Sequence, residues 1–267
     1  MLQRWRLIKD GPGDPAWNMA VDEALARMHD QPSRLPTLRL YTWTPPALSL
    51  GYFQKTGGIR FDELKRLGIV PVRRITGGRA VLHFGDLTYS IAMSSAGKIP
   101  AGVSASYRCL SRGLLAGFAI LGIDAALGSD RSGRGAPDTC FALSTGADIV
   151  FNGKKFVGSA QKRIGSSLLQ HGSILLHSQV EILNRIFANG ATNDEKMLRT
   201  QVTCLGDILG RPIDPEEAGR AIVEGFARAL EIEFFSDHLT DHEERTAREL
   251  LDKYRSIPQQ GEPIGNQ

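Results

Sequence analysis

Long apolar runs are missing from this sequence. No stretch approaches the roughly 18 to 20 consecutive apolar residues that a membrane helix needs. Residues 1–6, with the sequence MLQRWR, lack the apolar core of a signal peptide. We therefore expect a cytoplasmic protein with no membrane partner.

Cysteine is scarce and widely spaced. The three cysteines, Cys109, Cys140 and Cys204, form no CxxC pair or other metal-ligand spacing. We expect neither a disulfide framework nor a metal site. Any cysteine chemistry would use a free thiol.

A strong charge of either sign is also lacking. The formal net charge is +3 and the sequence pI is near 8.8, a mild and dispersed basic excess that is too weak to predict nucleic-acid binding. Hydrophobic residues make up 42% and charged residues 23%, which is ordinary globular composition. Repeats, low-complexity blocks and obvious linkers are not found, so a single domain is the economical interpretation.

Periodicity predicts both helices and strands. Asp14 followed by Pro15 is a typical helix start, and alternation in 38–43 and 47–52 predicts two short strands. Tyr41, Trp43 and Tyr52 in these strands either line a pocket or are ordinary core aromatics. Helical spacing recurs in 61–67, 104–122, 180–187, 200–208, 215–230 and 239–254.

One informative stretch begins at Lys155 and continues into Gly158, Ser159 and Ala160. We expect these small residues to form a turn at which a ligand can approach the main chain closely. Strands are expected on both sides, in 149–151 before an Asn-Gly turn and in 173–176, after His171 and Gly172. The pattern indicates an acyl-handling site; an ordinary buried hairpin with a solvated lysine is the alternative.

A second informative stretch covers residues 72–83, where a diglycine turn separates two predicted strands. Its backbone amides, with Arg73, Arg74 and Arg79 around them, could hold a polar head group or a partner's acidic surface. A simple hairpin with solvated arginines fits the local pattern equally well.

A candidate nucleophile follows a loop-like segment. Residues 129–139 are rich in Gly, Ser, Arg and Pro and lead directly to Cys140. Nearby cations lower the pKa of a thiol and an exposed loop gives access to it, so Cys140 is a better candidate than the helical Cys109.

The two motifs, in this order, resemble the biotin/lipoate protein ligase and lipoyl transferase family over roughly residues 38–232. Within it, the sequence looks most like the cysteine-dependent octanoyltransferases of the LipM type. This resemblance implies an α/β fold, a mixed β-sheet flanked by helices, with a catalytic domain in 37–235, a helical lead-in in 1–36 and a C-terminal helix and tail in 236–267. It also implies that Cys140 is the acyl-thioester nucleophile and that Lys155 lowers its pKa and contacts the carbonyl. The substrate-binding residues would be Arg73, Gly77, Gly78, Arg79, His83, Gly158, Ser159, Ala160, Gln161, His171 and Gly172.

The implied activity is transfer of octanoyl from octanoyl-acyl carrier protein, through a thioester on Cys140, to a lysine of a lipoyl-domain protein such as glycine cleavage H protein. The donor is already activated, so no cofactor is expected. Amides near 158–161 could stabilise the oxyanion, and Val81, Val157 and Leu175 could floor an acyl tunnel.

Three alternatives remain open. Octanoylated H protein could serve as the donor, the protein could be an ATP-dependent lipoate-protein ligase, or it could be a non-enzymatic binding module. Arg79 stands where the ligases usually have a third glycine, which favours the transferase. Phe84 stands where an acidic residue is expected after the histidine, a departure in the donor-side contacts.

Overall fold

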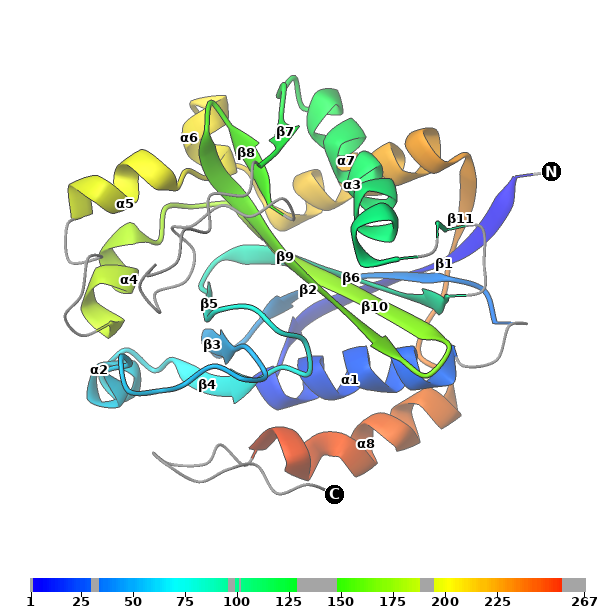
Figure 1. Cartoon of the computed structure of the whole chain (residues 1–267), viewed down its shortest axis with the longest axis horizontal. Coiled ribbons are helices and arrows are strands. Elements are labelled where there is room, and N and C mark those ends of the chain that lie inside the picture. Colours follow the sequence, from blue (N-terminus) through cyan, green and yellow to red (C-terminus); the bar gives the residue numbers. More distant parts are fainter. Residues whose placement is uncertain are drawn as a thin grey trace.

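An eight-stranded mixed sheet forms the centre of the protein (Figure 1). The computed structural model describes residues 2–29, 34–95, 99–100, 102–128, 148–187 and 195–255. From edge to edge the strands are β11 (Ile232–Ser236), β1 (Gln3–Gly13), β2 (Thr37–Trp43), β6 (Asp86–Ser94), β10 (Ser167–Leu175), β9 (Lys154–Ile164), β8 (Ile149–Phe151) and β7 (Ala126–Leu127). The first three run parallel, and every later pair is antiparallel. The expected mixed sheet is confirmed.

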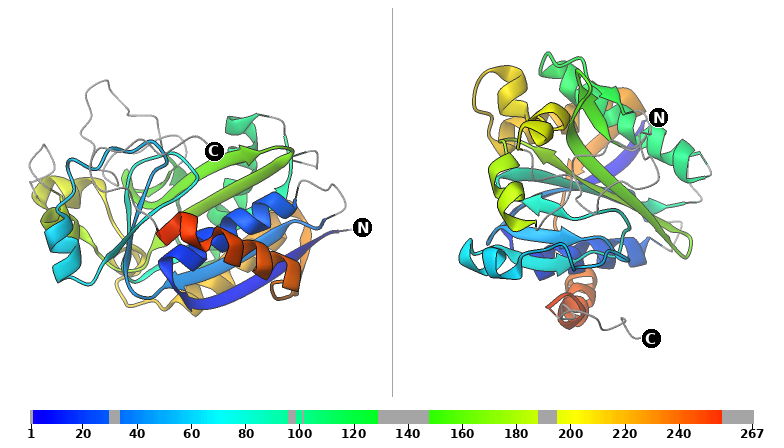
Figure 2. Two further views of the ribbon diagram at one scale, coloured as in Figure 1. Left: turned by 90° about the horizontal axis from the view of Figure 1, so that it is seen from below. Right: turned by 60° about the vertical axis from the view of Figure 1, so that its left-hand side comes forward.

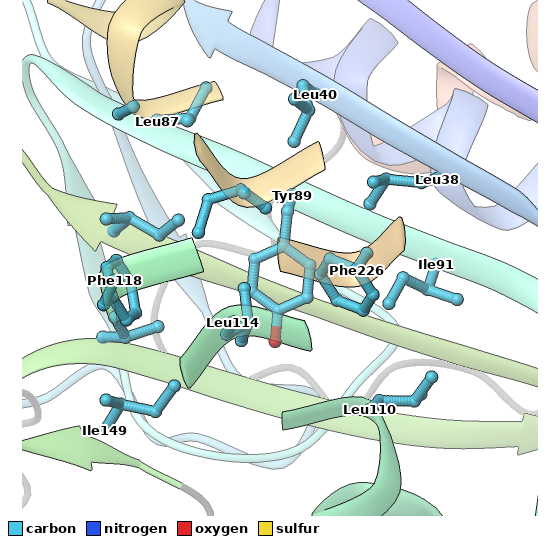
Figure 3. Packing of buried hydrophobic residues seen from close by; sticks show 14 of the residues in the cluster. Leu38, Leu40, Leu87, Tyr89, Ile91, Leu110, Leu114, Phe118, Ile149 and Phe226 are labelled. Atoms are coloured by element: carbon cyan, nitrogen blue, oxygen red, sulfur yellow. The ribbon is translucent and has the colours of Figure 1, made fainter. Parts of the chain in front are cut away.

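Helices cover both faces of this sheet. Helices α3 (Val103–Ile120) and α7 (Pro215–Leu230) lie on one face, and α1 (Pro15–Met28) and α8 (Asp241–Arg255) lie on the other (Figures 1 and 2). The α3 and α7 backbones approach closely at glycine residues. A Cβ at Gly225 would lie only 2.1 Å from the backbone nitrogen of Gly117, so a side chain there would not fit. Figure 3 shows the core beneath them, where Tyr89, Phe118 and Phe226 pack among leucine and isoleucine side chains. None of the helices in the described ranges is long and apolar enough to cross a membrane.

Two of these helices begin as their sequences predict. The side chain of Asp14 accepts hydrogen bonds from the backbone N–H groups of Ala16 and Trp17, at 3.0 and 3.1 Å. Asp214 accepts one from Glu217 at 2.7 Å, and in both helices a proline follows the capping residue. The capping side chain accepts from backbone N–H groups that have no acceptor within the helix. Proline in the first turn has no N–H, so it leaves no such donor unsatisfied.

A smaller sheet lies beside the main one and corrects one expectation. It consists of β4 (Val70–Arg73), β3 (Ala47–Leu50) and β5 (Val81–His83), with α2 (Phe61–Arg66) and α4 (Val180–Ile186) against it. The simple hairpin considered for residues 72–83 is wrong, because β4 and β5 pair with opposite edges of β3 rather than with each other. The segment between them therefore crosses from one edge of β3 to the other as a loop.

The small-residue turn predicted at Gly158, Ser159 and Ala160 is also wrong, because these residues lie within β9. They pair with Ser173, Gly172 and His171 of β10, respectively. The actual turn into β9 is at Asn152 and Gly153, as the sequence predicts, and both residues have positive φ, 49° and 75°. Small residues fit here because the strands are crowded: a Cβ at Gly172 would lie 2.5 Å from the Ser159 hydroxyl and 2.7 Å from the Gly158 carbonyl oxygen.

Two further differences from the sequence predictions concern the helix expected after β10 and the N-terminal residues. The single helix predicted in 200–208 is wrong, because this range contains the end of α5 (Glu195–Gln201), a break, and most of α6 (Leu205–Leu209). The break occurs where Val202 bridges to Lys155 and Thr203 donates its N–H to the Lys155 carbonyl at 2.9 Å, so tertiary pairing extends the chain there. Residues 1–36, expected as a helical lead-in, supply strand β1 of the main sheet as well as helix α1, and β1 pairs with the edge strand β11.

Candidate active site

A cavity of about 300 Å³ opens between the main sheet, α1 and the small sheet. Its walls come from α1, β2, β3, the loop between β4 and β5, β5, β6 and the β9–β10 hairpin. The lining residues are Met19, Tyr41, Trp43, Ser49, Arg74, Gly78, Arg79, Val81, His83, Thr88, Asp148, Lys155, Gly158, Ser159, Ala160, His171, Gly172 and Ser173. The two sequence motifs therefore meet in one place.

Most of the sequence-predicted site residues line this cavity. Those brought together are Gly78, Arg79, His83, Lys155, Gly158, Ser159, Ala160, His171 and Gly172. Of the aromatics considered for a pocket, Tyr41 and Trp43 line it and Tyr52 does not. The predicted nucleophile, Cys140, lies outside the described residues.

Three predicted residues do not line the cavity and instead support its surroundings. The Nη1 atom of Arg73 donates to the carbonyls of Gly51 and Gln54 at 2.7 and 3.0 Å, which holds the segment after β3. Gly77 accepts at its carbonyl from Arg74 at 2.9 Å. Gln161 donates its side-chain amide to Gln170 Oε1 at 2.9 Å.

Lys155 is buried rather than solvated. Its ammonium lies 3.0 Å from Asp148 Oδ1, and the side chains of Lys155 and Asp148 are only 8% and 4% exposed. Both residues line the cavity. The alternative of a solvated lysine is therefore wrong, and its partner Asp148 was not identified from the sequence.

His171 is held from both ring nitrogens. Nδ1 is 2.9 Å from Asp22 Oδ2 and Nε2 is 2.7 Å from Thr76 Oγ1. Burial raises the pKa of Asp22, but the hydrogen bond with His171 and the charge of Arg39 outweigh it and lower the pKa below its usual value. Asp22 is therefore a carboxylate, which only accepts, so the proton of its bond to His171 is on Nδ1.

The carboxylate of Asp22 also accepts hydrogen bonds from strands β2 and β6 beneath α1. Arg39 Nη1 and Ser90 Oγ donate to Oδ1 at 2.9 and 2.8 Å, and Tyr41 donates to Oδ2 at 2.8 Å. Burial, with the nearby Asp22 charge, raises the pKa of Tyr41 well above 10, so its hydroxyl keeps its proton and remains a donor. Neither Asp22 nor Arg39 was identified from the sequence, because a polar residue within an apolar helix face or strand carries no motif.

His83 forms a second carboxylate–imidazole pair across the cavity. Nδ1 is 2.8 Å from Asp86 Oδ2, and Nε2 is 2.8 Å from the hydroxyl of Ser49. Trp43 stacks on the imidazole with 4.0 Å between the ring centroids. Phe84 follows His83 directly, and the carboxylate that contacts the imidazole belongs to Asp86, three positions after the histidine.

The cavity combines an apolar wall with fixed polar groups. Met19, Tyr41, Trp43 and Val81 supply surface that suits an alkyl chain. The other two residues proposed for a tunnel floor, Val157 and Leu175, are fully buried and do not line the cavity. Within the described ranges, no cluster of His, Cys, Asp or Glu is arranged to hold a metal ion.

A mixed-sheet domain whose central hairpin and diglycine loop enclose an apolar cavity with a buried lysine has the architecture of an acyl-handling catalytic domain. Sequence comparison agrees: the family model for the lipoyl protein ligase A/B catalytic domain matches residues 14–227, and the chain belongs to that family.

Individual proteins show the same likeness. An octanoyltransferase LipM of Kyrpidia tusciae is 42% identical, over 95% of this chain and 97% of that protein. The structure of Ta0514 of T. acidophilum with bound lipoic acid is similar, with a TM-score of 0.79 and 30% identity over 95% of this chain and 96% of that one. A lipoate-protein ligase A bound with ATP has a TM-score of 0.80 and 28% identity, and the match covers 97% of each chain.

Proposed function

We propose that this protein is an octanoyltransferase of protein lipoylation, which moves an octanoyl group onto a lysine of a lipoyl-domain protein. The observation that carries the proposal is the cavity itself, which a buried lysine and several apolar side chains line together. The similarity to an octanoyltransferase over almost the whole chain supports the same conclusion.

The transfer proceeds in two steps. The thiolate of Cys140 adds to the carbonyl carbon of a donor thioester, and collapse of the tetrahedral intermediate releases the donor thiol and leaves octanoyl on Cys140. The amine of the acceptor lysine then attacks this thioester, loses a proton and releases the Cys140 thiol. The first step exchanges one thioester for another, and the second forms a more stable amide, so the reaction needs no nucleotide.

The residues named in this scheme have separate roles. Cys140 precedes Asp148 by eight positions in the sequence (148 − 140 = 8), and Asp148 fixes the ammonium of Lys155 in the cavity. Lys155 stabilises the thiolate and then polarises the acyl carbonyl. The strand from Gly158 to Ala160 and the His171–Gly172 pair form the surface on which the acyl group rests.

We further propose octanoyl-acyl carrier protein as the donor and glycine cleavage H protein as one acceptor, both in the cytoplasm. Octanoylated H protein is the second candidate donor. The structural similarity to an ATP-bound lipoate-protein ligase makes ATP-dependent ligation the competing activity.

Mass spectrometry tests the intermediate directly. Incubation with octanoyl-acyl carrier protein should add one octanoyl group to Cys140, and hydroxylamine should remove it. Cys140→Ala should remain unlabelled, whereas Cys109→Ala, a matched cysteine variant in α3, should be labelled like the wild type. Absence of an adduct on the wild type, or equal labelling of Cys140→Ala, would refute the proposal.

Comparing donors distinguishes the competing activities. Octanoyl-acyl carrier protein, octanoylated H protein, and lipoate with ATP are each supplied with an unmodified lipoyl domain. The proposal predicts rapid transfer from the first only, with loss in Cys140→Ser. ATP-dependent lipoylation that survives Cys140→Ser would instead identify a ligase.

A further inference from the structure

The arginine side chains that line the cavity differ in how many of their N–H donors have an acceptor among the described residues. Arg74 donates to Thr76 Oγ1, to the Ser49 carbonyl and to the carbonyls of Gly77 and Arg79, at 3.1, 2.8, 2.9 and 2.7 Å. A guanidinium has five N–H donors, so Arg74 is almost saturated by the protein. Its function is to hold the diglycine loop.

Arg79 is different. It lines the same cavity, and its Nη1 atom is buried without a hydrogen-bond partner among the described residues. A buried, unpaired donor on a charged group is costly, and native proteins retain few of them. An unused donor at the wall of a cavity indicates that a ligand supplies the acceptor.

The backbone that carries Arg79 is rigidly placed. Arg74 holds the Arg79 carbonyl at 2.7 Å, and Gly78 has a φ of 93°, a conformation that favours glycine. A Cβ at Gly51 would lie 1.8 Å from the Gly78 carbonyl oxygen, so the loop packs directly on the end of β3. The guanidinium therefore extends from a fixed base, as a preorganised donor requires.

The chemistry of the ligand follows from these surroundings. An alkyl chain against Met19, Trp43 and Val81 offers no acceptor, and an octanoyl group has only its carbonyl oxygen to offer. Lys155 is engaged with Asp148, so Arg79 brings a second cation to the same space.

We propose that Arg79 is a further catalytic residue, whose Nη1–H donates to the carbonyl oxygen of the octanoyl group in both transfer steps. When the attacking sulfur or nitrogen adds to the carbonyl carbon, the π electrons move to that oxygen and the guanidinium stabilises the charge. Collapse restores the carbonyl and expels the leaving thiolate, and Arg79 gives up no proton. This assignment rests on the proposed octanoyl transfer.

Three proteins are compared: wild type, Arg79→Gln and Arg66→Gln. Arg66 lies on α2, exposed and paired with Glu63 away from the cavity, and serves as the matched arginine control. Losing one oxyanion donor typically lowers kcat by about 10²–10³-fold. We expect that loss in the rate of Cys140 acylation by Arg79→Gln, with KM changed far less, and no loss in Arg66→Gln.

Thermal unfolding separates this role from a structural one. Because the Nη1 donor of Arg79 has no hydrogen-bond partner in the described part of the chain, Arg79→Gln should unfold at or above the wild-type temperature. A lowered unfolding temperature, or acylation within threefold of wild type, would overturn the assignment.

Inhibitor binding tests Arg79 without relying on turnover. Octanoate and octan-1-ol have the same chain length but differ in the charge of the oxygen group. Wild type should bind octanoate at least about tenfold more tightly than the alcohol, and Arg79→Gln should bind the two within about threefold of each other. An unchanged octanoate preference would refute the role of Arg79, whereas a wild type that keeps this preference but transfers no octanoyl would refute the proposed function alone.

Discussion

Replacing Asp22 by Asn should destabilise the protein through a buried charge that loses its partner. Asp22 is 1% exposed and lies 2.9 Å from Arg39, which is also fully buried. The amide of Asn keeps the shape of the side chain but removes its charge and one pair of acceptor sites. The guanidinium of Arg39 and the hydroxyls of Tyr41 and Ser90 then compete for weaker acceptors.

The magnitude follows from what remains around Arg39. Breaking a buried ion pair by removing one partner typically costs about 3–5 kcal/mol. Arg39 keeps a 2.7 Å contact with Asp10, so the lower end, about 3 kcal/mol, is expected. For a chain of this size that loss corresponds to a decrease of about 6–12 °C in the unfolding temperature. Asp10→Asn, which removes the partly exposed partner of the same arginine, should cost only about 1 kcal/mol.

The pH dependence of the free energy of unfolding provides a second test of the same variant. The pKa of Asp22 is lowered in the folded protein from an unfolded value of 3.8, so its contribution is fully present above pH 3.8 and is lost as pH falls through the folded pKa. Urea unfolding of wild type and Asp22→Asn should therefore differ by a constant amount from pH 7 down to about pH 4 and converge below it. A difference under about 1 kcal/mol at pH 7, or one that does not shrink in acid, would refute this reasoning.

Two further changes test the walls of the cavity. Gly172→Ala would place a Cβ 2.7 Å from the backbone carbonyl oxygen of Gly158, so we expect a loss of about 1–3 kcal/mol in urea unfolding, against no comparable loss for Gly57→Ala, which has open space. Lys155→Met removes the buried 3.0 Å ion pair between Lys155 and Asp148 and should cost about 3 kcal/mol. Adding Asp148→Asn should recover most of that stability but no octanoyl transfer; recovery of transfer would show that the lysine acts only through stability.

Local signals predicted the elements whose causes are local. The helix start at Asp14 and the turn at Asn152–Gly153 depend on backbone groups within three residues of the signal, so the sequence displays them directly. Strands that no local cap or turn signal marks were missed or assigned to another structure. Strand β1 pairs with β2 and β11, and its conformation depends on partners elsewhere in the chain.

The diglycine segment shows the same limit at the site. Its residues fit a hairpin, but β3 lies between β4 and β5 and takes one strand on each edge. Likewise the small residues after Lys155 are compatible with a turn when considered alone. In the structure they are strand residues, because β10 offers a continuous antiparallel edge that pairs with them. Propensity is a weak guide where such pairing is available.

The residues read along the chain were enough to predict the order of the two motifs, most of the helices, the Asn-Gly turn and the candidate pair Cys140 and Lys155. Tertiary structure decided what surrounds them: Asp148 beside Lys155, Asp86 behind His83, and Asp22 behind His171, which is 149 positions away in the chain. The physical reason is that caps and turns are satisfied by neighbouring backbone groups. A buried carboxylate is instead stabilised by whichever distant donors the fold delivers to it.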